Sequence, residues 1–193
     1  MTRNVAWRQT WLTRVGTSLV GGGNDQFRME IVYIETSLVS LLIANPSRDL
    51  VTAGHQQATR DWWRRRRASF RCVTSDETLV ECARGNAEQV RLRLEVLAPL
   101  PTLRITAEVE RLAAEFLSTG SLPATARSDA VHLAAASIAR ADYLLTWNCR
   151  HLANAQILRR IEREATRCGW NLPTVCTPLE LMGESTYENE SDS

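Results

Sequence analysis

The sequence predicts a three-layer α/β/α sandwich built on a central parallel sheet. Short apolar runs such as MEIVYIE (29–35) and FRCVT (70–74) alternate along the chain with longer helical segments. Short apolar strands that are separated by helices are typical of a parallel sheet covered on both faces. A chain of 193 residues, of which 44% are hydrophobic and 23% are charged, suits one domain with a sizeable core.

Strand and helix signals alternate in the first half of the chain. A strand near 30–35 precedes the short helix TSLVSLLIAN, which Thr36 or Ser37 is expected to cap. Ser75 and Gly85 mark the start and the end of a later helix. The elements expected in this half are strands at 30–35, 70–74 and 103–106 and helices at 36–45, 48–67, 75–85 and 86–98.

The second half continues this alternation. A helix that ends before Gly120 and Pro123 precedes an alanine-rich helix, and the apolar run DYLLTW predicts a fourth strand. NAQILRRIEREATRC is amphipathic with a helical period. The elements expected here are helices at 107–118, 127–140 and 154–168, strands at 142–147 and 174–177, and a final turn at 178–183.

The folded domain is expected to span residues 29–182. Residues 1–28 are rich in glycine near their end and lack periodicity, which predicts a poorly ordered extension and makes Met29 a candidate start. Residues 183–193 are acidic and polar, which predicts a disordered tail.

Charge and cysteine content exclude some classes of protein. The net charge is +1 although all 23 basic residues are arginine, so bulk charge gives no argument for nucleic acid. No apolar stretch approaches the length of a membrane span. Five cysteines without a C-x-x-C pair indicate reduced, buried thiols in a cytoplasmic protein, and three histidines show no zinc-ligand spacing.

Acidic and amide side chains occur where the carboxyl ends of the predicted strands should lie. Glu35 closes the first strand, Glu81 lies in the helix after the second, and Asp129 begins the alanine-rich helix. Asn148 follows the fourth strand. Functional groups of open α/β sheets gather outside the carboxyl ends of the strands, so these four side chains are expected to converge. Hydroxyl groups accompany them at Thr36, Ser37 and Thr146.

Carboxylates that cluster in this way repel one another unless a cation neutralises them. Mg²⁺ and Mn²⁺ prefer oxygen ligands, and such a site can activate water for attack on a phosphodiester. Each residue also has a structural explanation: Asp129 can stabilise a helix dipole, and Asn148 can cap a turn. The convergence of four such residues favours a metal site.

Four motifs in the sequence resemble those of a known family. They are YIETS (33–37), SDETLVECARG (75–85), SDAVHLAAA (128–136) and DYLLTWNCRHLAN (142–154). Residues 29–182 as a whole resemble the PIN domain, in particular the VapC-like toxin ribonucleases of bacterial type II toxin–antitoxin systems. The last two motifs are the most specific part of the match.

The resemblance implies a PIN-like fold and a divalent-metal-dependent endoribonuclease that acts as a toxin. It implies catalytic roles for Glu35, Glu81, Asp129 and Asn148, with Mg²⁺ or Mn²⁺ held by the three carboxylates. Supporting roles follow for Thr36, Ser37, Thr146 and His151. The implied partners are a single-stranded or structured RNA substrate, a cognate antitoxin and a second copy in a homodimer. Two departures stand out, because Glu35 and Asn148 occupy positions where the family commonly has Asp.

The run WWRRRR is the candidate RNA-binding segment. Its cations can contact phosphates, and the tryptophans beside them can stack on bases. The cations are Arg64, Arg65, Arg66 and Arg67. A solvated helix end or an antitoxin-binding surface would explain the same run.

The main alternative is a degenerate PIN module that binds RNA or a protein partner without cleavage, which the departures at Glu35 and Asn148 motivate. Two other enzyme classes fit less well. YIETSLVS carries no glycine for a G-x-G-x-x-G dinucleotide site, and no Asp-x-Asp follows the first strand as a phosphatase of that type requires.

Overall fold

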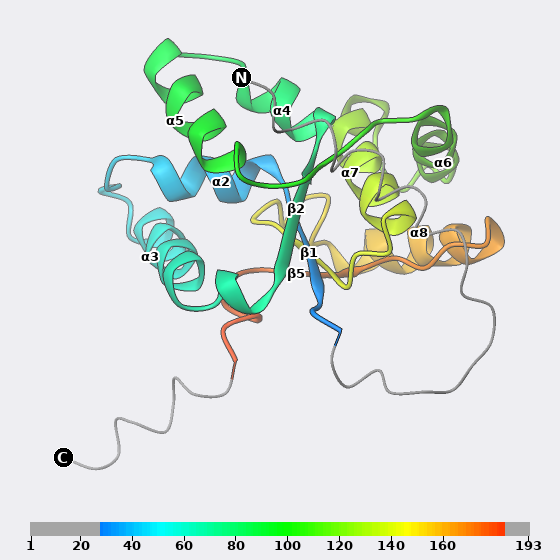
Figure 1. Cartoon of the computed structure of the whole chain (residues 1–193). Helices are drawn as coiled ribbons and strands as arrows, with labels where there is room; N and C mark the ends of the chain where they lie inside the picture. The colour runs from blue at the N-terminus through cyan, green and yellow to red at the C-terminus, as the bar shows by residue number, and fades with distance from the viewer. Residues whose placement is uncertain (1–27, 184–193) are drawn as a thin grey trace, which may run out of the picture.

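The computed structural model describes residues 28–183, which form a five-stranded parallel sheet between two layers of helices (Figure 1). The strand order is β3-β2-β1-β4-β5, so the first strand lies at the centre. The strands are β1 Ile31–Ile34, β2 Arg71–Ser75, β3 Thr102–Leu103, β4 Tyr143–Leu145 and β5 Thr174–Cys176. The predicted three-layer architecture is thereby confirmed.

Strand β1 shows why the sheet needs two helical layers. Ile31 and Tyr33 contact one buried cluster, whereas Val32 and Ile34 contact another. Successive side chains of a strand point to opposite faces, so an uninterrupted apolar strand has to be covered on both. The short apolar runs of the sequence reflect this requirement.

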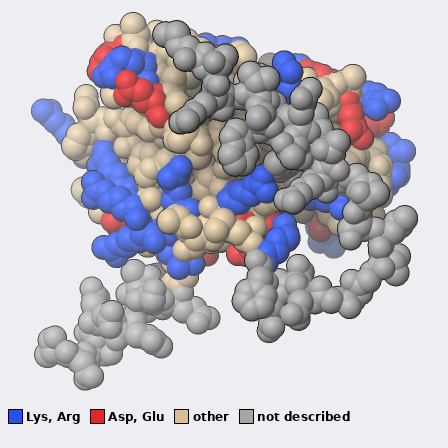
Figure 2. Space-filling view, in the orientation of Figure 1, with Lys and Arg blue, Asp and Glu red and all other residues tan. Residues whose placement is uncertain are grey.

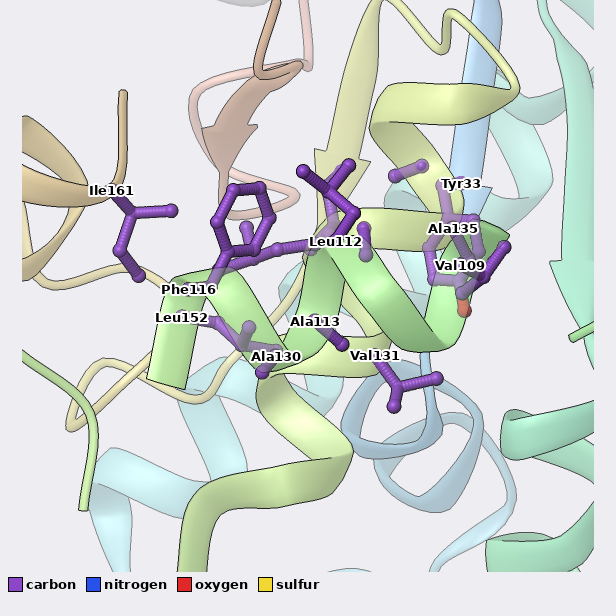
Figure 3. Close-up of a cluster of buried hydrophobic side chains, with 14 of the residues drawn as sticks. Tyr33, Val109, Leu112, Ala113, Phe116, Ala130, Val131, Ala135, Leu152 and Ile161 are labelled. Atoms are coloured by element: carbon purple, nitrogen blue, oxygen red, sulfur yellow. The ribbon is translucent and has the colours of Figure 1, made fainter. Parts of the chain in front are cut away.

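One layer consists of the C-terminal helices α6 (Ala107–Ser118), α7 (Arg127–Ile138) and α8 (Ala155–Arg167). Figure 3 shows Phe116 of α6 pointing toward Ile161 of α8, and both side chains are fully buried. Helix α7 buries eight consecutive residues from Ala130 to Ser137 because it lies between α6 and the sheet. Its small alanine side chains allow these elements to pack closely.

The other layer contains α2 (Thr36–Ile43), α3 (Leu50–Arg65) and α5 (Ala87–Leu97). Its largest buried side chain is Trp62, which stacks on Phe70 at a ring distance of 5.9 Å. The Trp62 indole also donates a hydrogen bond of 3.2 Å to the carbonyl of Leu181, which holds the end of the described chain against this layer. Helix α4 (Asp76–Cys82) follows β2 and contacts helices of both layers, α2, α5 and α7.

Most expected elements agree with the structure to within a few residues. The helix expected at 75–85 ends at Cys82, three residues before Gly85. Glu35, rather than Thr36 or Ser37, is the N-cap of α2, since its carboxylate accepts a hydrogen bond from the Ser37 amide. The helix expected at 48–67 ends at Arg65 and is followed by a short 3₁₀ helix, η2 (Arg67–Ser69). The strand expected at 103–106 consists of Thr102–Leu103, and Thr106 instead caps α6. A second 3₁₀ helix, η3 (Ala124–Ala126), precedes α7.

The expectation of buried thiols is only partly correct. Cys72, Cys82 and Cys176 are buried and free, whereas Cys149 is exposed and Cys168 is half-buried. None of the helices within residues 28–183 combines the length and the hydropathy that a membrane-spanning segment needs. The predicted N-terminal extension and acidic tail lie almost wholly outside the described residues.

Candidate functional site

The predicted acidic residues line one pocket at the carboxyl edge of the sheet. The pocket has a volume of about 380 Å³ and is open to solvent. Its lining residues come from four parts of the chain and are Glu35, Thr36, Ser37, Glu81, Arg84, Asp129, His132 and Asn148. The carboxyl ends of β1, β2 and β4 thus bring together residues that are up to 113 positions apart, from Glu35 to Asn148.

Glu35 lies directly after β1 and is only 4% exposed. Its carboxylate accepts a hydrogen bond of 2.8 Å from the Ser37 amide and another from the Ser37 hydroxyl. Burial raises the pKa of Glu35, although His132, Ser37 and Thr146 act in the opposite direction. A buried carboxylate under this desolvation penalty is a group that a bound cation would stabilise.

Glu81 is held by a buried chain of hydrogen bonds. Its carboxylate lies 3.0 Å from Nε2 of His132, and Nδ1 of His132 lies 2.8 Å from the Tyr33 hydroxyl. That hydroxyl contacts Oγ of Ser75 at 2.6 Å. The hydroxyl of Thr36 donates to the same carboxylate. Two β strands and two helices therefore fix the orientation of one carboxylate.

Glu81 and His132 each stabilise the charged form of the other. Burial alone would raise the pKa of Glu81, but the hydrogen bond and the charge of His132, with smaller effects of Thr36 and Ser128, lower it to about 2. Burial would lower the pKa of His132, yet Tyr33, Glu81 and Glu35 raise it well above its ordinary value. A carboxylate paired with an imidazolium is therefore the favoured state.

Asp129 has a second and more accessible set of partners. It begins α7 and accepts a hydrogen bond of 2.7 Å from the side-chain amide of Asn148. Its other oxygen lies 2.7 Å from Nδ1 of His151. The amide oxygen of Asn148 accepts from the backbone N–H of His151 at 3.1 Å. Asn148 thus orients Asp129 with one end of its side chain and fixes the following loop with the other.

The hydroxyl groups predicted as supporting residues connect these segments. Oγ of Ser37 accepts a hydrogen bond of 2.8 Å from the backbone N–H of Trp147 and donates to Glu35. Oγ1 of Thr146, which is fully buried, accepts from the Asn148 amide at 2.9 Å. The loop after β4 is therefore tied to the start of α2.

The chemistry of this donor set fits a hard divalent cation. Three carboxylates and two hydroxyls line the pocket, and oxygen ligands are those that Mg²⁺ and Mn²⁺ prefer. Within residues 28–183, however, no three His, Cys, Asp or Glu side chains converge closely enough to form a ready metal site. The reason is visible in the contacts, since each carboxylate is turned toward its own hydrogen-bond donors.

The arginine run lies at the opposite edge of the sheet from the pocket. Helix α3 and η2 lead into the amino end of β2, whereas the pocket lies beyond its carboxyl end (Figure 1). A five-residue strand spans about 16 Å, which separates the two sites. Arg66 and Arg67 lie over the rings of Phe70 and Trp63, at 5.7 Å and 4.7 Å. Figure 2 shows basic side chains gathered at the lower left, over α3.

Arg84, Tyr33 and His132 lie at the site although the sequence alone did not indicate them as site residues. Helical spacing could have indicated two of them, because Arg84 lies three residues after Glu81 and His132 three residues after Asp129. Tyr33 gives no such signal, since its hydroxyl meets His132 across 99 positions.

The sequence matches no family model, and no curated protein matches it. Among solved structures, the chain is similar to the crystal structure of VapC20 from Mycobacterium tuberculosis, described as a toxin that cleaves the sarcin–ricin loop. The two chains are 18% identical, the match covers 58% of this chain and 86% of that one, and the TM-score is 0.46. A similarity of this extent carries no information about activity, so the geometry of the pocket has to support any functional proposal.

Proposed function

We propose that this protein is a divalent-metal-dependent endoribonuclease of the PIN type. The observation that carries the proposal is the convergence of Glu35, Glu81 and Asp129 on one open pocket at the carboxyl edge of a parallel sheet. Simple helix caps or surface charges would not need to meet in one place. The resemblance of the motifs around these residues to those of VapC-like toxins supports the same activity.

Glu35, Glu81 and Asp129 would hold the ion, with Thr36 and Ser37 beside them. The chemistry that Mg²⁺ or Mn²⁺ supplies is the activation of water and the stabilisation of charge on a phosphodiester. The residues of the chain prepare the pocket for this purpose. His132 holds Glu81 in its ionised form, and Asn148 and His151 fix both oxygens of Asp129.

A toxin of a type II pair would require partners that this chain does not contain. We extend the proposal to a cognate antitoxin that restrains the enzyme, to a homodimer and to an RNA substrate. Arg64 to Arg67 remain candidates for contact with the antitoxin or with distant parts of the RNA, because they lie away from the pocket.

One observation favours a second function, an RNA-binding module that does not cleave. Both polar ends of Asn148 are used within the protein, so its oxygen is engaged by the His151 amide. A site in which Asn148 contributes no ligand depends on three carboxylates alone. Metal-dependent turnover separates this binding module from the enzyme.

The test is a cleavage assay on single-stranded RNA during titration with Mn²⁺. Asp129→Asn should lower kcat/KM by more than about a hundredfold, because loss of a ligand should exceed the 10- to 100-fold effect typical of residues behind the ligands. Mn²⁺ should also raise the melting temperature of the parent more than that of the variant. Glu88→Gln, which removes an exposed carboxylate paired with Arg91 on α5, is the matched control.

Unchanged cleavage by Asp129→Asn, or cleavage by the parent in excess EDTA, would refute the metal-dependent mechanism. Binding of RNA by the parent without turnover at any Mn²⁺ concentration would instead favour the binding module.

A further inference from the structure

The pocket contains one cation that the predicted mechanism does not use. Arg84 lines it together with the three carboxylates, two residues beyond the end of α4. Arg84 is exposed, and no hydrogen bond or ion pair involves its side chain among the contacts of residues 28–183. An arginine that shares a pocket with carboxylates but does not pair with them is available for an external anion.

The structure holds the backbone of Arg84 in place. The guanidinium of Arg93 on α5 donates to the carbonyl of Arg84 at 2.5 Å and to the carbonyl of Cys82 at 3.1 Å. Gly85 then turns the chain with a φ of +101°, a conformation that favours glycine. These contacts cap the end of α4, so the position from which the Arg84 side chain extends is fixed.

Pairing within the pocket explains why Glu81, three residues before Arg84, does not neutralise it. The Glu81 carboxylate is already engaged by His132 and Thr36 on the inner side. The nearest acid along the helix is thus occupied, and the exposed Arg84 lines the pocket without pairing with that acid. Because His132 and Thr36 engage Glu81, this carboxylate does not pair with Arg84.

The charge of the pocket points to the anion that Arg84 would receive. Three carboxylates outnumber the one paired imidazolium, that of His132, so the pocket has an excess of negative charge that repels a phosphodiester. A guanidinium presents a fork of donors that fits two phosphate oxygens at once. We infer that Arg84 binds a phosphate of the RNA strand at the mouth of the pocket. This inference rests on the proposed ribonuclease function and assigns the local RNA contact to Arg84 instead of the arginine run.

The experiment measures binding of the full-length protein to a single-stranded RNA in EDTA, where no metal-dependent turnover occurs. Arg84→Gln should weaken binding about tenfold, as expected for loss of one charge-assisted contact. It should also reduce the salt slope of log Kd by about 0.7, the contribution of one phosphate contact to a single strand. Arg84→Lys should retain the salt slope but not the full affinity.

Two control variants test whether the loss of RNA binding is specific to Arg84. Arg163→Gln on α8 removes an exposed cation that lines a different pocket, and the double variant Arg64→Gln/Arg65→Gln tests the opposite edge of the sheet. We expect both to weaken binding less than Arg84→Gln. The melting temperature of Arg84→Gln should match that of the parent, since its side chain has no partner to lose.

Binding by Arg84→Gln that equals the parent in affinity and salt slope would overturn the inference, as would a larger loss in the Arg64/Arg65 variant. Because binding is measured without metal, these results do not depend on catalysis. A parent that binds RNA through Arg84 but never cleaves it would refute the proposed enzyme while supporting the RNA contact.

Discussion

Two carboxylate–histidine pairs line the same pocket and differ in their surroundings. Glu81 and His132 are 3.0 Å apart, and the His132 side chain is 2% exposed. Asp129 and His151 are closer, at 2.7 Å, but the His151 side chain is 20% exposed. In the first pair, the contact between the two side chains and their further partners lower the pKa of Glu81 and raise that of His132 in spite of burial. The two pairs therefore differ in how deeply the histidine is buried and in its further partners.

The two histidines differ in their other hydrogen-bond partners and in their exposure to water. His132 is bonded at both ring nitrogens, and Tyr33 and Ser75 extend the chain of contacts into the core. His151 lies in the loop after β4, where water reaches it. A buried polar group that loses its partner cannot turn to water, whereas an accessible one can. The two pairs should therefore respond differently to the same substitution.

The largest effect is expected for His132→Ala. This change removes one hydrogen-bond partner from the Tyr33 hydroxyl and one from the Glu81 carboxylate, and it removes a side chain that fills the core. We expect the free energy of unfolding to fall by about 3 kcal/mol, as for other buried pairs that lose one member. Urea denaturation of both proteins in EDTA measures the change. A loss below about 1 kcal/mol would mean that the buried pair is not strongly coupled.

An intermediate effect is expected for Ser75→Ala, which tests the remote end of the same chain of contacts. Ser75 accepts from the Thr78 amide as the N-cap of α4 and contacts the Tyr33 hydroxyl. Loss of both should lower the free energy of unfolding by about 2 kcal/mol. Thr106→Ala is the matched control because Thr106 caps α6 without contact to this chain. Equal losses in the two variants would show that the Tyr33 contact contributes nothing.

The smallest effect is expected for His151→Ala. The pair with Asp129 is accessible to water, and Asn148 still donates to Asp129 in the variant. The free energy of unfolding should fall by about 1 kcal/mol or less. Thermal and urea denaturation should agree on this value. A loss as large as that of His132→Ala would remove the distinction between the pairs.

The sequence allowed the pocket to be predicted because one rule governs its members. Glu35 closes the first predicted strand, Glu81 lies in the helix after the second, and Asp129 lies in the first turn of the alanine-rich helix. The carboxyl ends of parallel strands share one edge. The sequence could not show which groups they contact. The hydrogen bond between Tyr33 and His132, for example, depends on the packing of α7 against β1, which no local spacing encodes.

The same rule places the arginine run away from the pocket. Helix α3 leads into β2, so its last residues lie at the amino end of that strand, opposite the pocket. This position follows from the predicted order of elements alone. Arg84 follows the helix after β2 and lies at the carboxyl edge for the same reason. Arg64 to Arg67 stay an untested prediction for RNA contact, and topology adds Arg84 as a cation beside the pocket.

The two outermost strands have a consequence for how copies of the protein could associate. β3 has two residues and β5 has three, and they form the two edges of the sheet. Very short edge strands present few free backbone groups to another chain, which discourages joining of sheets into larger aggregates. The α/β/α architecture thus makes the helical faces the larger surfaces on which the proposed second copy or antitoxin could dock.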